Sequence, residues 1–406
     1  MNDANTDSSL RQSGADPQHW LLDPGVVFLN HGSFGSCPRA VLEKQREFRD
    51  RMERQPVRFF IRELEGLWDE ARQALSQFVG ANTDDLVFVP NATTGMNTVL
   101  RSLRFEPGDE LLVTNHEYNA CRNALNFVAE QSGARVVVAK VPFPFQHEDD
   151  LVQPILEHIT PRTRLALLDH VTSQTGVVFP LTRLVRELAA RSVETLVDGS
   201  HAPGMVPLNL NEIGAAYYTG NCHKWICAPK GVAFLQVRRD RQAGLRPLVI
   251  SHGANSSRTD RSRFLLEFGW TGTSDPSACL CVPEALRFMS SLRPGGWPEV
   301  MQHNRALVLA ARRVLSQALG TKAPCPDEFI GSLASLPLPD TAPTSPSKSP
   351  LHLDPLQDQL LHEHGMEVPV IPWPAPPQRL LRVSAQLYNS LSQYEQLAKV
   401  LVTELN

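Results

Sequence analysis

Residues 217–225 read YYTGNCHKW and place Lys224 among aromatic and small side chains, with no acidic neighbour. Earlier in the chain, residues 195–202 read TLVDGSHA, an apolar run that leads into Asp198. A lysine in such surroundings loses solvation, so its amine is neutral more often than that of a surface lysine. A neutral amine can condense with an aldehyde, and a carboxylate at a strand end can keep a pyridine nitrogen protonated. The two segments together therefore predict a pyridoxal 5′-phosphate (PLP) site.

The middle of the chain alternates short β-rich runs with helical stretches. Continuous apolar strands that alternate with helices are typical of a mainly parallel sheet covered by helices on both faces. In such sheets, ligands bind beyond the carboxyl ends of the strands. The sequence predicts strands at 86–90, 110–114, 135–141, 165–169, 195–198 and 231–237, and helices at 39–77 (broken near Pro56), 93–103, 119–131, 181–191, 356–364 and 390–405, with a further strand at 380–384.

We expect four regions along the chain. Residues 1–16 are polar and are predicted to be a disordered lead-in, followed by a segment at 17–60 that packs on the C-terminal domain and on a partner subunit. The large PLP-binding domain is expected at 61–289 and a smaller α/β domain at 290–406. Within the latter, residues 337–350 (PLPDTAPTSPSKSP) predict a mobile, proline-rich loop.

Composition excludes several classes of protein. The 406 residues are 42% hydrophobic and 20% charged with a net charge of −4, which is typical of an ordinary soluble globular protein and does not indicate a nucleic-acid or anionic-membrane partner. No apolar run reaches the length of a membrane span, and the N-terminus has no signal-peptide core. Seven cysteines without a Cys-x-x-Cys pair predict reduced thiols in a cytoplasmic protein, although one of them could be a nucleophile. His362 and His364 would point to different faces of a helix, so no metal site is expected.

Two further segments predict anion binding. Residues 91–95 (NATTG) follow a predicted strand and open a helix, where amides, hydroxyls and the helix dipole attract a phosphate; the alternative is a simple N-cap. Arg382 lies between Leu381 and Val383, so it is either buried or directed at an anion such as an amino-acid carboxylate. His31 lies in a glycine-bearing loop that permits close approach to a ligand, although a plain turn fits equally well.

Six segments resemble the class V aminotransferase family of fold-type I PLP enzymes, and in particular its isopenicillin N epimerase-like and hercynylcysteine sulfoxide lyase-like branch. This resemblance implies an α/β fold with a large, mainly parallel seven-stranded sheet and a smaller C-terminal α/β domain. It also implies a homodimer with the active site at the subunit interface. The matching segments are FLNHGSFG (28–35), NATTG (91–95), HEYNA (116–120), DGSHAPG (198–204), NCHKW (221–225) and LRVS (381–384).

The resemblance also implies a role for each residue. Lys224 would carry the covalent link to PLP, Asp198 would pair with the pyridine nitrogen, His201 would lie near the ring, and Tyr118 would stack on it. The other implied contacts are Thr93, Thr94 and Asn221 to the phosphate, Thr273 to the phosphate of the other subunit, Ser173 to the phenolic oxygen, His223 beside the lysine, and His31 and Arg382 to the substrate. Cysteine desulfurases of this class have a catalytic cysteine before that arginine, but residues 364–374 contain none.

These features predict an enzyme that acts at the α-carbon of an amino acid or of a small molecule containing one, with Lys224 as the base. The first expectation is epimerase or racemase chemistry. The close alternative is a carbon–sulfur β-lyase, and an aminotransferase is a less favoured one, because all three reactions share one carbanion. An alternative of a different functional class is a binding protein that has the fold of PLP enzymes but no catalytic activity. The presence of Lys224, Asp198 and Arg382 together argues against this alternative.

Overall fold

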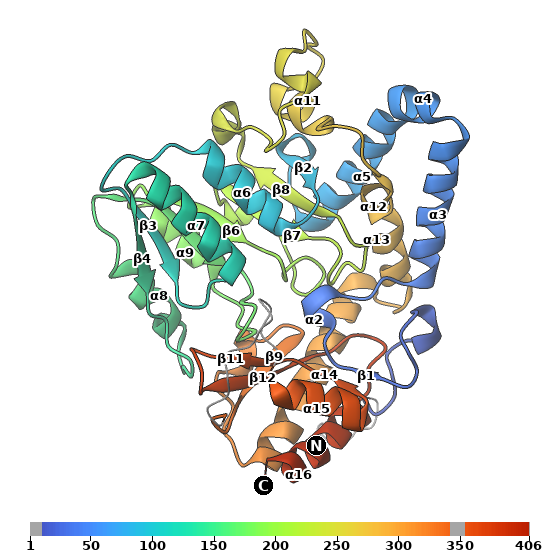
Figure 1. The fold of residues 1–406 in the computed structure, drawn as a ribbon, viewed down its shortest axis with the longest axis vertical. Helices are drawn as coiled ribbons and strands as arrows, with labels where there is room; N and C mark the ends of the chain where they lie inside the picture. The colour runs from blue at the N-terminus through green and yellow to red at the C-terminus, as the bar shows by residue number, and fades with distance from the viewer. Residues whose placement is uncertain (1–9, 342–353, 406) are drawn as a thin grey trace.

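The computed structural model describes residues 10–341 and 354–405, and its centre is a seven-stranded sheet in the order β2-β8-β7-β6-β5-β3-β4 (Figure 1). Strand β8 is antiparallel to both of its neighbours, and every other pairing in this sheet is parallel. The predicted fold class is thereby confirmed. The strands are β2 (Leu86–Val89), β3 (Glu110–Thr114), β4 (Arg135–Ala139), β5 (Thr163–Asp169), β6 (Glu194–Asp198), β7 (Tyr217–Asn221) and β8 (Ala233–Val237).

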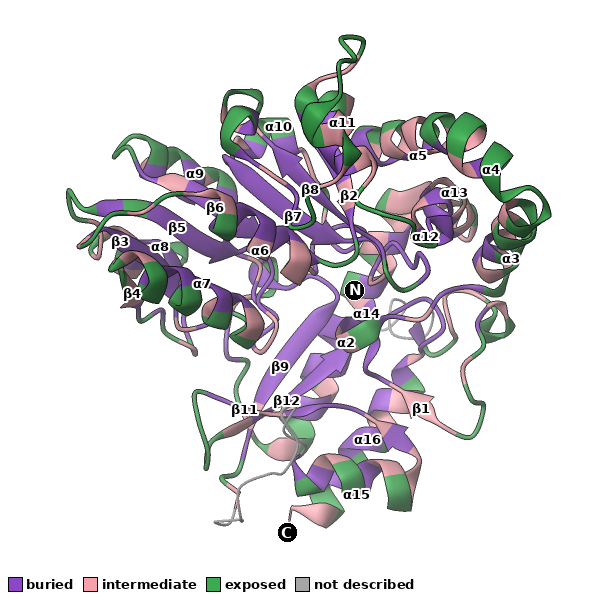
Figure 2. Ribbon diagram, turned by 45° about the horizontal axis from the view of Figure 1, so that its top comes forward, coloured by how far each residue is buried: buried purple, intermediate pink, exposed green. Residues whose placement is uncertain are grey.

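Helices cover both faces of this sheet, whose strands are almost entirely buried (Figure 2). Alternate residues of a strand point to opposite faces, so Leu111 and Val113 join one apolar cluster while Leu112 joins another. The helices of this part of the chain are α5 (Leu64–Val79), α6 (Ala92–Ser102), α7 (Asn119–Ser132), α8 (Glu148–Leu156), α9 (Leu181–Ala189), α10 (Leu210–Ile213), α11 (Arg263–Gly269), α12 (Ser277–Leu280) and α13 (Val282–Ser291).

The C-terminal region forms a second, smaller layer below the sheet in Figure 1. A three-stranded antiparallel sheet in the order β11-β12-β9 packs on helices there, and the short strand β1 (Val27–Phe28) pairs in parallel with β10 (Met366–Glu367). The remaining elements are β9 (Leu333–Leu338), β11 (Val370–Pro372), β12 (Arg379–Ser384), α14 (Gly296–Leu319), α15 (Pro355–His364) and α16 (Leu391–Glu404).

The expectation of a proline-rich loop at 337–350 needs one correction. Strand β9 runs through Leu338, and Pro337 pairs with Leu380 of β12. Because β9 is an edge strand of its sheet, it tolerates a proline that cannot donate a ladder hydrogen bond. The rest of the predicted loop, from residue 342, lies outside the described residues.

The N-terminal segment also differs from expectation. Residues 10–16 are packed and not disordered: Leu10 is buried, and the amide of Ala15 donates to the carbonyl of Leu387 at 3.0 Å. Residues 1–9 lie outside the described part. Helix α3 (Arg39–Arg54) packs against α12 and α13, so the second half of the 17–60 segment rests on the large domain and not on the C-terminal one.

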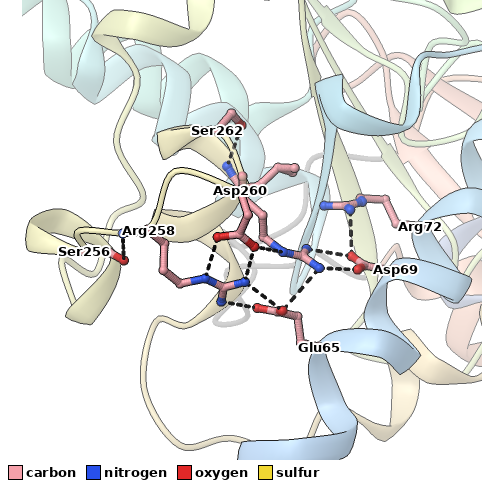
Figure 3. Close-up of polar contacts among 9 residues, drawn as sticks. Glu65, Asp69, Arg72, Ser256, Arg258, Asp260 and Ser262 are labelled. Atoms are coloured by element: carbon pink, nitrogen blue, oxygen red, sulfur yellow. Dashed lines mark hydrogen bonds and ion pairs between the residues drawn. The ribbon is translucent and has the colours of Figure 1, made fainter.

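The predicted helical region 39–77 is interrupted as expected. After α3, Pro56 opens the short α4 (Pro56–Arg58), a π-helical turn spans Phe59–Glu63, and α5 follows. A network of ion pairs then ties α5 to the segment before α11 (Figure 3). Arg258 contacts Glu65 at 2.7 Å, and Arg261 contacts Asp69.

Among the described residues, no helix is long and apolar enough to cross a membrane. Helix α2 (His31–Phe34) lies between the two layers (Figure 1) and leads the N-terminal segment past the carboxyl ends of the central strands.

Candidate active site

A cavity of about 660 Å³ lies where β5, β6 and β7 end, between the central sheet and the C-terminal layer. The parallel order of these strands brings their carboxyl ends to one edge, where sheets of this type bind ligands. The sequence predicted a site at this edge of the sheet. The predicted residues that line this one cavity are Thr93, Tyr118, Ser173, Asp198, His201, Asn221, His223, Lys224 and Arg382.

Lys224 follows β7 and lies in the cavity wall. Its Nζ is 3.0 Å from Nε2 of His201. Burial lowers the pKa of Lys224 to about 8, against the opposing attraction of Asp198 and with a smaller contribution from the positive charge of Arg382. The amine is therefore available in its neutral, nucleophilic form close to physiological pH.

His201 is buried, and its ring is held from the other side by Trp225. The indole Nε1 of Trp225 donates to Nδ1 of His201 at 3.4 Å. Burial, followed by the charges of Lys224 and Arg382, lowers the pKa of His201 well below its usual value. The imidazole is therefore neutral and, with Nδ1 accepting, carries its proton on Nε2, facing the lysine.

Asp198 ends β6 and is 4% exposed. Its Oδ1 accepts the amide of Ser200 at 2.8 Å, and its Oδ2 accepts the thiol of Cys121 at 3.2 Å. Gly199 must follow it, because a Cβ there would lie 2.3 Å from the ring of Tyr218. The carboxylate is thus fixed at the floor of the cavity, as the predicted partner of a ring nitrogen requires.

The N-terminus of α6 opens into the cavity at Thr93. Asn91 caps the helix: its Oδ1 accepts the amide of Thr94 at 2.8 Å and the hydroxyl of Thr94 at 3.0 Å. Asn221 accepts the amide of Ala92 at 2.9 Å. Thr94 is not among the residues that line the cavity, and its hydroxyl bonds to the capping Asn91, while its role as a phosphate ligand stays a prediction. Thr93 and the helix N-terminus remain suited to an anion.

Arg382 is a buried cation without a counter-ion. It is 3% exposed, and no carboxylate of the described residues lies within ion-pair distance of it. Its Nη1 donates to the carbonyl of Ser173 at 2.6 Å and its Nη2 to Oγ of Ser33 at 2.7 Å, while Nε has no partner. Burial lowers the pKa of Arg382 to about 10. A buried charge is costly unless it is paired, so this guanidinium is suited to a carboxylate that enters the cavity.

Three predicted residues have different positions. His31 is fully buried and does not line the cavity; Nδ1 lies 2.7 Å from the hydroxyl of Tyr388 and Nε2 lies 3.1 Å from the carbonyl of Lys224. It contacts the backbone of Lys224 from outside the cavity, and its role in substrate binding stays a prediction. Ser173 lines the cavity but engages Arg382. Thr273 is exposed and lies outside the cavity of its own chain.

Several residues of the site were not predicted from the sequence. Asn30 and Ser33 contact Arg382, whereas the sequence had predicted only that their glycine-bearing loop permits close approach to a ligand. Asp169, which ends β5 beside Asp198 and lines the cavity, and Glu117, which precedes Tyr118, form a buried acidic group with Asp198. Asp169 could have been recognised from the sequence, because it ends an apolar run as Asp198 does.

These groups fit PLP. Lys224 can hold its aldehyde, Asp198 its ring nitrogen, the N-terminus of α6 its phosphate, and Tyr118 its ring face. Glu117, Cys121 and Asp198 each offer a ligand atom within 4.8 Å of the others, but in this fit the Asp198 carboxylate faces the pyridine nitrogen. No cysteine lines the cavity among the described residues.

The chain matches the family described as Aminotransferase class-V over residues 27–343. It is 34% identical to isopenicillin N epimerase of Amycolatopsis lactamdurans, over 94% of this chain and 95% of that protein. It is 32% identical to a probable chloroplastic L-cysteine desulfhydrase of Arabidopsis thaliana, over 92% of this chain and 82% of that protein.

Among solved structures, the cystine C–S lyase C-DES in complex with cysteine persulfide superposes with a TM-score of 0.76 at 23% identity, covering 93% of this chain and 98% of that one. At that identity the likeness concerns the fold, and it confirms the predicted fold-type I architecture. The chain therefore belongs to the class V aminotransferase family of pyridoxal 5′-phosphate-dependent enzymes.

Proposed function

We propose that this enzyme removes the α-proton of an amino acid whose carboxylate is held by Arg382. The observation that carries the proposal is a buried guanidinium without a counter-ion in the same cavity as a lysine whose pKa burial lowers to about 8. A free α-carboxylate supplies the missing charge, and a largely neutral lysine supplies the base.

Each residue has a defined task in this reaction. PLP supplies the electron sink for the negative charge that develops at Cα. Arg382 and Ser33 orient the substrate carboxylate, Lys224 takes the proton, and His201 holds the lysine amine through Nε2. Asp198 keeps a positive charge on the ring nitrogen in place, because its own oxygens are fixed by Ser200 and Cys121.

Epimerisation is the first candidate for the next step. It is supported by the match to isopenicillin N epimerase, which spans nearly the whole of both chains. Epimerisation requires an acid that returns the proton on the other face. Tyr118 lines the cavity, and burial raises the pKa of its hydroxyl, so that it stays protonated and able to donate.

Elimination of a sulfur-bearing β-substituent is the second candidate, supported by the similarity to a probable L-cysteine desulfhydrase. This reaction needs only one base at Cα, and Lys224 provides it. A cysteine nucleophile is not required, in agreement with the lack of a cysteine among the described residues that line the cavity.

We also propose that the enzyme is a cytoplasmic homodimer. All seven cysteines are free, which suits a reducing compartment. Phe34, at the cavity, is 68% exposed, and Ile61 is 74% exposed. Apolar side chains of this size are suited to a subunit interface, and Thr273 would then act in the other subunit.

Incubation in D2O separates the candidates. Deuterium at Cα of recovered amino acid, with change of configuration and without pyruvate, supports epimerisation. Pyruvate and ammonia, together with sulfide from L-cysteine or with cysteine persulfide from L-cystine, support elimination. A protein that develops no visible absorbance with PLP, or whose absorbance survives borohydride or Lys224→Ala, would be a non-catalytic binding protein.

A further inference from the structure

Two carboxylates that the proposed reaction does not use lie beside Asp198: Asp169, which lines the cavity, and Glu117, which does not. The β5–β6 register sets Asp169 directly beside Asp198, and Glu117 closes the group from the loop after β3. Asp169 is 2% exposed and Glu117 is 6% exposed. Three carboxylates therefore share one buried space.

The group has too few donors for three ionised acids. Asp198 receives the amide of Ser200 and the thiol of Cys121. Glu117 receives the amide of Tyr118 on Oε1 at 3.1 Å, but its Oε2 has no partner, and neither has Oδ2 of Asp169. Among residues 10–341 and 354–405, no basic nitrogen forms an ion pair with either acid. Two buried carboxylate oxygens thus stand without a donor, although buried polar groups are almost always hydrogen-bonded.

A proton shared between Glu117 and Asp169 would supply the missing hydrogen-bond donor. The side chains of Glu117 and Asp169 lie within hydrogen-bonding reach of each other. When two carboxylates share a site they do not both ionise, and one proton bridges them. Burial, followed by the negative charges of Asp169 and Asp198, raises the pKa of Glu117, and burial followed by Asp198 raises that of Asp169 well above its usual range.

We propose that Glu117 and Asp169 share one proton and hold a single negative charge behind Asp198. They act as positioning residues: the shared negative charge favours the protonated form of the lysine-bound cofactor, and the hydrogen bond between the two acids fixes the floor on which Asp198 rests. Arg122, whose positive charge acts on Glu117, donates to the carbonyl of Thr114 and forms no ion pair with either acid.

Variants in which an amide replaces one or both acids test how many protons Glu117 and Asp169 hold. In Glu117→Gln or Asp169→Asn, the amide N–H replaces the shared proton and the remaining acid keeps the single charge. In the double variant that charge is lost. We therefore expect each single variant to leave the pKa of the visible absorbance of lysine-bound PLP unchanged, and the double variant to lower it by about one unit, a tenfold change. Glu212→Gln, an exposed acid on α10, is the matched control.

Infrared spectroscopy gives a readout that needs no cofactor. The cofactor-free chain should show one carboxylic-acid carbonyl band that persists across neutral pH and disappears in either single variant. A wild type without this band overturns the proposal, even if a variant fails to fold. Equal, additive shifts from the two single variants would mean that both acids are ionised, and no shift in the double variant would mean that both are protonated. Stoichiometric metal in the dialysed protein would likewise overturn it. None of these outcomes depends on the reaction at Cα.

Discussion

The amine of Lys224 lies 3.0 Å from Nε2 of His201, and the tautomer of that histidine is fixed from behind. Trp225 donates to Nδ1 at 3.4 Å, so the neutral ring carries its proton on Nε2 and donates it towards the lysine. A hydrogen bond in this direction requires a neutral amine as acceptor. The hydrogen bond from His201 and the lowered pKa of Lys224 therefore both favour the neutral form of the lysine amine.

The first prediction concerns cofactor loading. Because the pKa of Lys224 is lowered to about 8, the rate at which the cofactor-free enzyme binds PLP covalently should rise with pH, reach half its maximum near pH 8 and level off above. At pH 7.5 roughly a quarter of the lysine is neutral, against about a thousandth for an unperturbed one. Stopped-flow absorbance measures this rate.

Trp225→Phe tests the tautomer. Without the indole donor, Nε2 of His201 can accept from a lysine ammonium, so the midpoint of the loading curve should move up by about one pH unit, or ~1.4 kcal/mol. Trp297→Phe, which removes an indole bond to the carbonyl of Leu286 far from the cavity, serves as control. An unchanged midpoint in Trp225→Phe would mean that burial alone sets the lysine pKa.

Arg382→Gln should weaken amino-acid binding strongly. Removing one member of a buried, hydrogen-bonded charge pair costs about 2–5 kcal/mol, so affinity for L-alanine should fall roughly 30-fold or more. Ethylamine, which lacks the carboxylate, should bind both proteins alike. Spectral titration of PLP-loaded enzyme measures both ligands. Arg379→Gln removes an existing ion pair with Asp354 and should lower stability without changing affinity. Equal losses for alanine and ethylamine would contradict carboxylate binding.

Gly95→Ala should loosen the phosphate end of the site. A Cβ at Gly95 would lie 2.3 Å from Oγ1 of Thr219, which is held by its bond to the carbonyl of Phe234 at 2.8 Å. Overpacking of this kind costs about 1–3 kcal/mol. A shift of α6 would move its N-terminus away from the position proposed for the PLP phosphate. PLP affinity should therefore fall roughly tenfold, and the melting temperature should fall as well.

A second glycine gives the control. Gly66 lies in α5 with nothing within 4 Å of an added Cβ, so Gly66→Ala should stabilise the protein by up to ~1 kcal/mol and leave PLP affinity unchanged. If Gly95→Ala matched Gly66→Ala in both measurements, the close contact between α6 and β7 would not be limiting.

Most of the architecture could be predicted because its strands are continuous apolar runs. LALLD and TLVD each end in an acid at the carboxyl edge, and the predicted cavity follows from that. By contrast, β7 was not predicted as a strand, because the glycine and asparagine of YYTGN have low strand propensity. Its place between β6 and β8 is imposed by tertiary pairing.

The details of the site depend on strand order, which the sequence does not contain. Glu117 and Asp169 become neighbours only because β3 lies beside β5 in the sheet. The loop that carries His31 shows the same dependence on packing: it approaches the cavity, but its backbone turns Asn30 and Ser33 towards Arg382 and turns His31 inward. Motifs identify the loop, and only packing decides which of its side chains faces the ligand.

The buried histidines predict loss of stability in mild acid. Burial lowers the pKa of His31 to about 3 and those of His116 and His170 to about 4. The folded state thus disfavours their protonation, and the stabilisation is complete above the unfolded pKa of about 6.5 and is lost as pH falls below it. At pH 5 each histidine should cost about 2 kcal/mol. Glu117 and Asp169, whose pKa values are raised, contribute with the opposite sign.

Urea unfolding at pH 7.5 and pH 5 tests this directly. The midpoint should fall markedly between the two, and His116→Gln should flatten the dependence by about 1.4 kcal/mol per pH unit below 6.5, although it also weakens the contacts with Thr175 and Val141. His252→Gln, at an exposed position, should leave the slope unchanged. A midpoint that stays constant down to pH 5 would show that these rings accept protons without unfolding, for example through water that enters from the cavity.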